Sequence, residues 1–529
     1  MKVVFRTDAS LQIGTGHVAR CLALAQALRQ RGATCRFVCR DHPGNLIERI
    51  RQSEFEALVL PMNTHIDHYD PASDQPVLEH APWLGSNWQT DAVQTKAAIV
   101  DFEPDWLVVD HYALDQRWEA SMRSHCKKIM VIDDLADRSH DCDLLLDQNL
   151  VESQSHRYNS LVPLHCVSLI GPVYALLQHQ YAELHSITSP RSGPVRRILV
   201  SFGGIDSQNL TKITIESFLA LKRSDIFLDV VANPASPYLG ELREQVRSHS
   251  NITLHEGLLS LAELMVQSDL AVGAGGTTTW ERLCLGLPSI TITVARNQQP
   301  IAASLAQREL IRWIGDHESV TIQALSEALD LEIGSPGLEA WSIACRELVD
   351  GRGAERTARI IGLSPSTPIR LRLACLADQQ CLFDWANDPV VRANSFNPAP
   401  ISLDTHERWF HSRLENTSGS KLYIAETKDN LPIGQVRFER RGDKDWEIHY
   451  GLWVGARRMG FGARIVELGL EKLRENHPEV RVLGYVKPKN IASQSIFKNL
   501  GFSCVREDTR FVYILPLYQS NSSHFFQGC

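Results

Sequence analysis

The chain has 529 residues, 43% hydrophobic and 22% charged, which is the composition of a globular protein with several domains. The net charge of −8 and the scattered Lys and Arg residues argue against a nucleic-acid-binding surface. No apolar stretch approaches about 18 residues and the chain opens directly on a predicted strand, so we expect neither membrane span nor signal peptide. We therefore expect a cytoplasmic protein, a monomer or small homo-oligomer, with no nucleic-acid or membrane partner.

The stretch from Arg6 to Leu28 places two glycines between a strand and a helix. Residues 3–5 form a short apolar run, and apolar residues recur at helical spacing over 18–28. Glycines at such a turn let the backbone approach a ligand, and the free N–H groups at the helix start can bind an anion such as a diphosphate. The alternatives are turn geometry and helix capping. The predicted site consists of Gly14, Thr15, Gly16 and His17.

Strands and helices alternate from Lys2 to about Leu184. Apolar runs predict parallel strands at 35–39, 106–109, 129–132 and 144–146. A doubly wound sheet of such strands binds its ligand at their carboxyl ends. Polar residues follow three of the runs, at 110–112, 133–134 and 147–149, although Asp and Asn also favour turns and caps there.

Four motifs in this part resemble one enzyme family. They are RTDASLQIGTGHVARCLALAQAL, VVDHYALDQRWE, VIDDLADRSHDCDLLLDQN and GPVYALL. They look like signatures of the UDP-2,4-diacetamido-2,4,6-trideoxy-β-L-altropyranose hydrolases, the UDP-releasing enzymes of pseudaminic acid biosynthesis. The resemblance implies that His17 is the catalytic base and that Tyr174, from the last motif, belongs to the substrate site.

The predicted chemistry is displacement of UDP from the anomeric carbon by water. UDP leaves readily once its charge is offset, so the main need is a base that aims and deprotonates water. Histidine, with an ordinary pKa of about 6.5, can do this near neutral pH. Asp8 or another carboxylate could orient the ring of His17. A single displacement would invert the anomeric configuration.

A second α/β segment follows the Ser- and Pro-rich stretch 186–194. Runs at 197–202, 227–231 and 270–272 predict its strands. Glycines follow the first of these strands, and the motif GAGGTTTWERLCLG over 273–286 follows the last. The small residues clear space for a diphosphate, and backbone N–H and hydroxyl groups can donate to it. The residues concerned are Gly203, Gly204, Gly275, Gly276, Thr277 and Thr278.

Two such half-domains that face a shared cleft resemble the GT-B fold of nucleotide-sugar enzymes, which requires no metal. In the peptidoglycan UDP-GlcNAc transferase of that fold the equivalent glutamate binds ribose hydroxyls, which implies this role for Glu281. Asn297 and Gln298 match a segment that contacts sugar or phosphate, with loop solvation as the alternative. His255 could hold uracil or phosphate, or could be a surface histidine.

Glycine and proline breaks divide the remainder of the chain. A helix is predicted at 337–349, and breaks follow at 350–353 and 362–368. The predicted parts are 1–188 and 189–350 for the two Rossmann-like lobes, 351–368 for a linker, and 369–529 for a separate α/β domain.

The last domain resembles the GNAT acyltransferases. Antiparallel strands are predicted at 422–426, 434–439 and 446–454, followed by the loop RRMGFG and a helix over 463–476. This loop resembles the R-x-x-G-x-G acetyl-CoA pyrophosphate loop, and 486–502 looks like the second GNAT motif. The resemblance implies acetyl-CoA as co-substrate, bound by Arg457, Arg458, Gly460, Gly462, Asn490 and Ser493.

The acceptor side of this domain also resembles a known enzyme. Residues 385–389 and 401–410 look like helices of the GNAT that acetylates the 4-amino group of the pseudaminic acid precursor. Glu447 and His449 point to one face and are candidate bases, unless they only contact solvent. Many GNATs have an acid tyrosine where this chain has Phe497, and Tyr485, Ser493 or water could replace it.

The whole sequence therefore predicts a bifunctional enzyme, a two-lobed UDP-sugar hydrolase fused to an N-acetyltransferase that acts on the preceding intermediate. One alternative keeps the fold but transfers the sugar to another acceptor, as a glycosyltransferase does. Another is that the GNAT-like half has lost its catalytic activity and serves as an acyl-CoA-binding or regulatory module.

Overall fold

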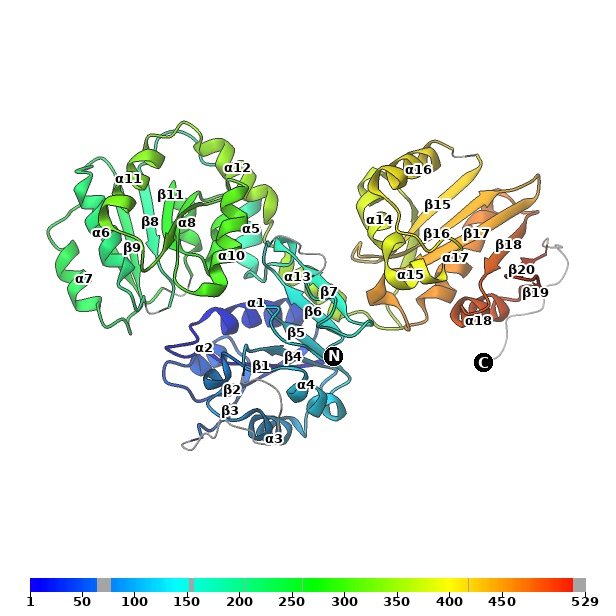
Figure 1. Cartoon of the computed structure of the whole chain (residues 1–529), viewed down its shortest axis with the longest axis horizontal. Coiled ribbons are helices and arrows are strands. Elements are labelled where there is room, and N and C mark those ends of the chain that lie inside the picture. The colour runs from blue at the N-terminus through cyan, green and yellow to red at the C-terminus, as the bar shows by residue number, and fades with distance from the viewer. Residues whose placement is uncertain (64–77, 152–156, 205, 259, 417, 517–529) are drawn as a thin grey trace. The chain divides into compact units, whose positions relative to one another are not determined.

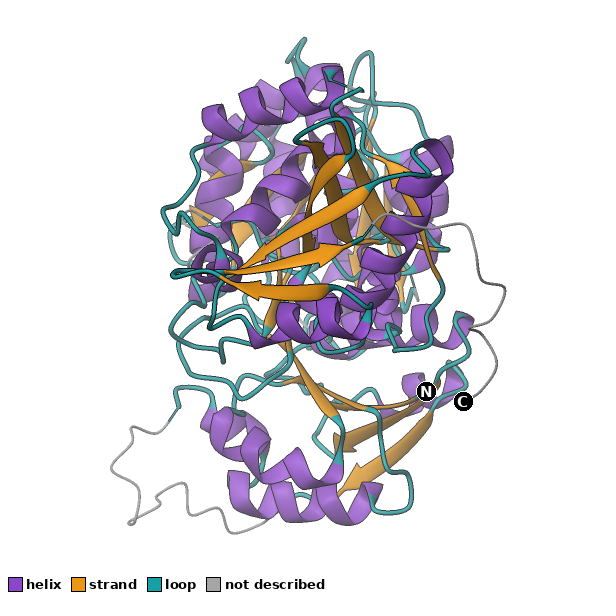
Figure 2. Ribbon diagram, turned by 90° about the vertical axis from the view of Figure 1, so that its right-hand side faces the viewer, coloured by secondary structure: helices purple, strands orange, loops and turns teal. Residues whose placement is uncertain are grey.

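The computed structural model describes residues 1–63, 78–151, 157–204, 206–258, 260–416 and 418–516. The chain divides into two compact units, Met1–Gly362 and Leu363–Cys529 (Figure 1). Helices flank the strands throughout the described part (Figure 2). None of its helices combines the length and the apolar character needed to cross a membrane.

The first sheet of the first unit has seven parallel strands in the order β3-β2-β1-β4-β5-β6-β7. The strands are β1 (Lys2–Thr7), β2 (Thr34–Arg40), β3 (Glu56–Leu60), β4 (Trp106–Asp110), β5 (Lys128–Ile132), β6 (Leu144–Asp147) and β7 (Val167–Ile170). The helices are α1 (Gly16–Gln30), α2 (Ile47–Gln52), α3 (Trp88–Ile99), α4 (Gln116–Met122) and α5 (His179–Ile187), with 3-10 turns η1 (Ala81–Leu84), η2 (Arg123–His125) and η4 (Pro172–Tyr174). The strand order reverses between β1 and β4, and a ligand crevice is expected at their carboxyl ends.

The second sheet has six parallel strands in the order β10-β9-β8-β11-β12-β13. The strands are β8 (Arg197–Ser201), β9 (Phe227–Ala232), β10 (Ile252–Glu256), β11 (Leu270–Ala274), β12 (Ser289–Thr293) and β13 (Arg312–Asp316). The helices are α6 (Leu210–Ala220), α7 (Leu239–Val246), α8 (Ala262–Gln267), α9 (Thr278–Cys284), α10 (Gln299–Gln307), α11 (Ile322–Ile333) and α12 (Leu338–Leu348), with the turn η5 (Arg296–Gln298). Here the order reverses between β8 and β11. The two sheets confirm the predicted pair of Rossmann-like lobes.

Burial explains why the strand predictions succeeded. Every residue of β4 and five of the six residues of β1 are buried, because helices cover both faces of a parallel sheet. Such strands appear in the sequence as continuous apolar runs. The runs predicted at 35–39, 129–132 and 144–146 lie in β2, β5 and β6 in the same way.

The predicted linker over 351–368 needs correction, because Gly353–Ile361 forms a helix, α13, that belongs to the first unit. Ala354, Ala358 and Ile361 are buried, and α13 packs against α1 and η4. The Trp106 indole donates to the Ile361 carbonyl at 3.1 Å. The glycine breaks on either side of α13 suggested a linker, whereas they only mark its ends.

The second unit contains a mixed seven-stranded sheet in the order β14-β15-β16-β17-β18-β20-β19. Its strands are β14 (Ile369–Leu373), β15 (Ser420–Thr427), β16 (Pro432–Arg440), β17 (Asp445–Leu452), β18 (Arg481–Val486), β19 (Ser503–Arg506) and β20 (Phe511–Leu515). Its helices are α14 (Gln379–Asn387), α15 (Pro389–Asn394), α16 (Leu403–Glu415), α17 (Phe461–Asn476) and α18 (Ile491–Asn499), with turns η6 (Leu376–Asp378) and η7 (Val454–Ala456). Among the described strand pairs of this sheet, only β17–β18 is parallel, and the pairing spans just 445–447 and 481–483. The two strands therefore separate toward their carboxyl ends.

Candidate active site

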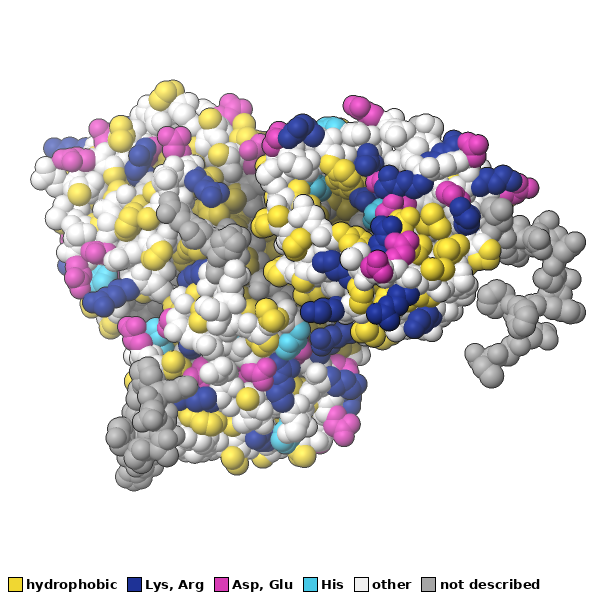
Figure 3. All heavy atoms as spheres, turned by 45° about the vertical axis from the view of Figure 1, so that its right-hand side comes forward, with side chains coloured by type: hydrophobic (Ala, Val, Ile, Leu, Met, Phe, Trp, Pro, Cys, Tyr) yellow, Lys and Arg dark blue, Asp and Glu magenta, His cyan; other side chains and the backbone are white. Residues whose placement is uncertain are grey.

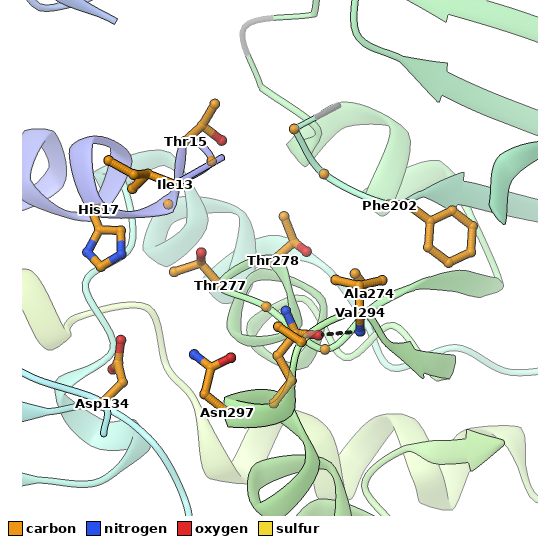
Figure 4. Close-up of a pocket in the computed structure, with 18 of the residues that line it drawn as sticks. Ile13, Thr15, His17, Asp134, Phe202, Ala274, Thr277, Thr278, Val294 and Asn297 are labelled. Atoms are coloured by element: carbon orange, nitrogen blue, oxygen red, sulfur yellow. Dashed lines mark hydrogen bonds between the residues drawn. The ribbon is translucent and has the colours of Figure 1, made fainter. Parts of the chain in front are cut away.

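A cavity of about 390 Å³ lies in the first unit, at the turns where both lobes reverse their strand order. Its lining comes from the turns after β1, β4, β5, β6, β8, β11 and β12, from η1 and from the start of α1. His17 and Asp134 lie at one end and Phe202 at the other (Figure 4). This volume lies in the range of small-molecule sites.

The glycine turns of the two lobes come close together in this cavity. Gly14 and Gly203 have φ of 80° and 79°, in the left-handed region that favours glycine. A Cβ on Gly16 would lie 2.6 Å from the Thr277 hydroxyl oxygen, and one on Gly204 would lie 4.0 Å from the Cα of Gly14. The sequence thus keeps side chains out of the place where the lobes approach each other.

His17 is held by a carboxylate from the neighbouring strand. Its Nδ1 lies 2.6 Å from Oδ1 of Asp110, the last residue of β4. A carboxylate only accepts hydrogen bonds, so Nδ1 carries the proton and Nε2 of the neutral ring keeps a lone pair. Because β1 and β4 are adjacent, the turn after β1 and the end of β4 bring these residues together.

Arg20 holds Asp110 in its ionised form. Arg20, one turn after His17, donates to both Asp110 oxygens at 2.7 Å and to Asp134 Oδ2 at 2.6 Å. Burial opposes ionisation of Asp110, but the charge of Arg20 and the hydrogen bonds from Arg20 and His17 outweigh it and hold the pKa of that carboxyl well below its usual range. Asp110 is therefore ionised near neutral pH, where it can accept the hydrogen bond from His17.

The cavity brings together twelve of the residues predicted for the sugar-nucleotide site. They are Gly14, Thr15, Gly16, His17, Gly203, Gly204, Gly275, Gly276, Thr277, Thr278, Asn297 and Gln298. Gln298 also fixes the turn after β12, since its Oε1 accepts from the Val294 N–H at 3.0 Å.

Four other predicted residues do not line this cavity. Asp8 is fully buried, accepts from the Arg40 N–H at 2.7 Å and pairs with Arg6 at 2.7 Å, so Asp110 and not Asp8 orients His17. His255 lies in β10 rather than in a loop, and its Nε2 contacts Asp229 at 2.8 Å.

The other two are Tyr174 and Glu281. Tyr174 ends η4, against which the first residue of α13 packs. Glu281 lies in the first turn of α9, next to Tyr181 of α5. Burial raises the pKa of Glu281 to about 7, although the Tyr181 hydrogen bond acts in the opposite direction.

Sequence reasoning missed several residues that line or support the cavity. Asp110 and Asp134 were noticed only as polar residues at strand ends, and Arg20 and Trp83 were not singled out. Arg20 could have been found from its spacing, because residues i and i+3 share one face of a helix. Trp83 carries no such signal, since it belongs to a turn between β3 and α3.

In the second unit, the predicted pyrophosphate loop leads into the 16-residue helix α17. Arg458 and Gly460 have φ of 62° and 78°, so the loop turns sharply before Phe461 begins the helix. Gly462 is buried, and a Cβ there would lie 2.8 Å from Ile496. Arg457 forms an ion pair with Asp388 at 2.8 Å, which ties the loop to the start of α15. The N-terminal N–H groups of α17 are thus presented on a fixed loop.

Asn490 and Ser493 lie at the start of α18. The Asn490 side chain accepts from the Ser493 N–H at 3.2 Å, which caps this helix. The Tyr450 hydroxyl of β17 reaches Ser493 Oγ at 2.8 Å. Phe497 is buried and packs against Phe502 and Tyr513, so it offers the site only an apolar ring.

The candidate bases Glu447 and His449 lie side by side on β17, with His449 Nε2 at 3.0 Å from Glu447 Oε1. Burial favours the neutral form of Glu447. The hydrogen bonds to His449 and Arg441 and the charges of these residues outweigh burial and lower the pKa of Glu447 to about 2. Glu447 is therefore a weak base. Lys and Arg side chains are grouped on the visible face of this unit (Figure 3).

Comparisons with known proteins agree with this division of the chain. Residues 369–503 match the family model described as the acetyltransferase (GNAT) domain. An uncharacterized protein of Methanocaldococcus jannaschii is 23% identical over 519 residues, covering 95% of this chain and 96% of its own length. The UDP-2,4-diacetamido-2,4,6-trideoxy-beta-L-altropyranose hydrolase of Campylobacter jejuni is 25% identical over 310 residues, covering 58% of this chain and 97% of its own.

Among solved structures, MurG of Acinetobacter baumannii is 12% identical, with a TM-score of 0.47, and the match covers 68% of this chain and 99% of that one. The sequence relatives and the family model show the ancestry of the two parts. The N-terminal part of the chain is homologous to the Campylobacter hydrolase, and residues 369–503 belong to the GNAT acetyltransferase family.

Proposed function

We propose that the first unit hydrolyses a UDP-linked diacetamido-trideoxy sugar at its anomeric carbon, and that the second unit acetylates the amine of its precursor with acetyl-CoA. The observation that carries the hydrolase proposal is the His17–Asp110 pair, 2.6 Å apart, with the histidine open to a cavity between two glycine turns. The choice of sugar in this proposal follows the substrate of the homologous Campylobacter enzyme, as its name gives it.

In the proposed reaction His17 Nε2 takes a proton from water, and the water oxygen attacks the anomeric carbon. Asp110 holds the ring in the required tautomer and stabilises the imidazolium that forms, as carboxylates do in other histidine-dependent hydrolases. The C–O bond to UDP breaks, and the diphosphate keeps the electron pair. The N–H groups of the glycine turns and of the α1 N-terminus favour that charge.

In the second unit His449 is the proposed base, because its partner Glu447 is too acidic to take a proton near neutral pH. The amine attacks the thioester carbonyl, the C–S bond breaks, and the CoA thiolate needs a proton. We assign this proton to Tyr450. Burial raises the pKa of Tyr450, so its hydroxyl stays protonated, and it lies where β17 and β18 separate.

The test of the hydrolase is UDP release from the diacetamido-trideoxy UDP-sugar with no acceptor present. Wild type should turn over, and His17→Gln and Asp110→Asn should each lower kcat by about 10³-fold or more, since the base or its tautomer is lost. The matched controls are His255→Gln and Asp229→Asn, which break a similar histidine–aspartate pair away from the cavity.

The controls should keep wild-type kcat. If all four variants lose kcat equally, general destabilisation explains the loss in His17→Gln, and the catalytic role of His17 is overturned. UDP release that requires an added sugar acceptor would instead support a glycosyltransferase.

A further inference from the structure

Two aromatic side chains form one wall of the cavity beside His17. The Tyr112 ring lies edge-on to His17, with ring centroids 4.6 Å apart. Trp83 stacks near-parallel on Tyr112 at 5.7 Å, with an interplanar angle of 26°. Both line the cavity, whereas Phe202 lies at the end far from His17 (Figure 4). We call Trp83 and Tyr112 the aromatic wall.

The aromatic wall is held rigidly in place. The Tyr112 hydroxyl donates to Asp134 Oδ2 at 2.6 Å, and burial together with that carboxylate raises the pKa of Tyr112 well above its usual value. Trp83 belongs to the turn η1, which Gly85 ends with φ of 62°. A Cβ on Gly85 would lie 2.7 Å from His42 and 2.8 Å from Met62, so only glycine fits there.

The surroundings of the aromatic wall differ in polarity from the wall itself. Trp83 is only partly buried, although Trp118, Trp280 and Trp446 are each buried to within 2%. Asp134, which accepts from the Tyr112 hydroxyl, and the polar side chains of Gln148 and Asn149 also line the cavity. Aromatic rings beside hydrogen-bonding groups match a sugar ring, which has an apolar face and polar edges.

We infer that the aromatic wall binds the apolar face of the sugar and selects deoxygenated, N-acetylated hexoses. This inference rests on the proposed hydrolase function. A methyl group at C6 and the methyl groups of acetamido substituents add apolar surface that Trp83 can cover, and covering apolar surface favours binding. A 6-hydroxyl would leave a polar group against the ring.

The test compares UDP release from the diacetamido-trideoxy UDP-sugar and from its 6-hydroxy counterpart. Wild type should prefer the 6-deoxy sugar, and Trp83→Ala should raise KM for it by about 10-fold or more and reduce the preference, while Trp83→Phe retains most of it. The matched control is Trp88→Ala, a partly buried tryptophan of the same lobe outside the cavity lining. Inhibition by free UDP should be the same in all four proteins.

Unchanged KM and preference in Trp83→Ala would overturn the inference, and so would an equal effect of Trp88→Ala. If wild type releases no UDP, the hydrolase proposal fails separately. Calorimetric titration with the same UDP-sugar and with UDP then decides about the aromatic wall. Weaker binding of the UDP-sugar but not of UDP in Trp83→Ala supports it, and equal binding of both contradicts it.

Discussion

At the scale of single residues, Tyr450 is the proposed acid of the second unit. Its hydroxyl lies 2.8 Å from Ser493 Oγ, whereas the buried Phe497 offers only an apolar ring. Tyr450→Phe removes only the hydroxyl, so we expect kcat for acetyl transfer to fall by about 10²-fold with little change in KM for acetyl-CoA.

The matched control is Tyr485→Phe, because the Tyr485 ring is covered by Arg510, whose guanidinium carbon lies 4.2 Å from its centroid. CoA release at saturating amine measures both variants. A loss confined to Tyr485→Phe would transfer the acid role to that residue.

Glu281 predicts a pH dependence of stability. Its pKa of about 7 in the folded protein lies above its ordinary value near 4.5, so the folded state binds more protons than the unfolded state between these values. The stabilisation by protonated Glu281 is complete below about pH 4.5 and is lost as the pH rises toward 7, by of order 1 kcal/mol for a partly buried group.

Glu281→Gln removes this titration while keeping a polar side chain next to Tyr181. The thermal midpoint of wild type should therefore fall relative to Glu281→Gln between pH 5 and pH 8. A constant difference between the two proteins across this range would contradict the raised pKa.

At the scale of elements, Gly16 at the start of α1 lies close to Thr277 of the second lobe. A methyl group on Gly16 would lie 2.6 Å from the Thr277 hydroxyl oxygen, and that crowding costs about 1–3 kcal/mol. Gly16→Ala should raise KM for the UDP-sugar accordingly.

Adding Thr277→Ala removes the crowding atom, so the double variant should bind better than the sum of the single effects predicts. Steady-state kinetics of the four proteins measures this coupling. Strictly additive effects would mean that the two turns do not crowd each other.

The elements also show what a sequence can and cannot predict. The glycine turns and His17 were found because their pattern is local, and the apolar runs of β2, β4, β5 and β6 predicted buried strands. The sequence suggested Asp8 as the partner of His17 because Asp8 is nearer along the chain. Asp110 lies 93 positions from His17, and only the pairing of β1 with β4 brings the two together. Helix α13 was missed because it is short and lies between glycines, and only its packing against α1 defines it.

At the scale of the whole molecule, the boundary after Gly362 separates two compact units, each with its own buried hydrophobic clusters. Leu363 packs in the core of the second unit, and Arg464 donates to the carbonyls of Pro365 and Thr367 at 3.1 and 3.0 Å. We expect residues 1–362 and 363–529 to fold as separate proteins.

Each fragment should keep its own activity within about twofold, since no catalytic group assigned above crosses the boundary. Circular dichroism and the two product assays measure this. An unfolded or inactive 1–362 fragment would show that the first unit depends on the second.

We propose that one chain performs acetylation and then UDP release. The most direct measurement incubates the full chain with UDP-4-amino-4,6-dideoxy-β-L-AltNAc, with and without acetyl-CoA, and follows CoA and UDP by ion-exchange chromatography. We predict that UDP appears only with acetyl-CoA, and that His17→Ala releases CoA but no UDP. UDP released equally without acetyl-CoA would contradict the order of the two steps, and UDP released by His17→Ala would contradict the role of His17.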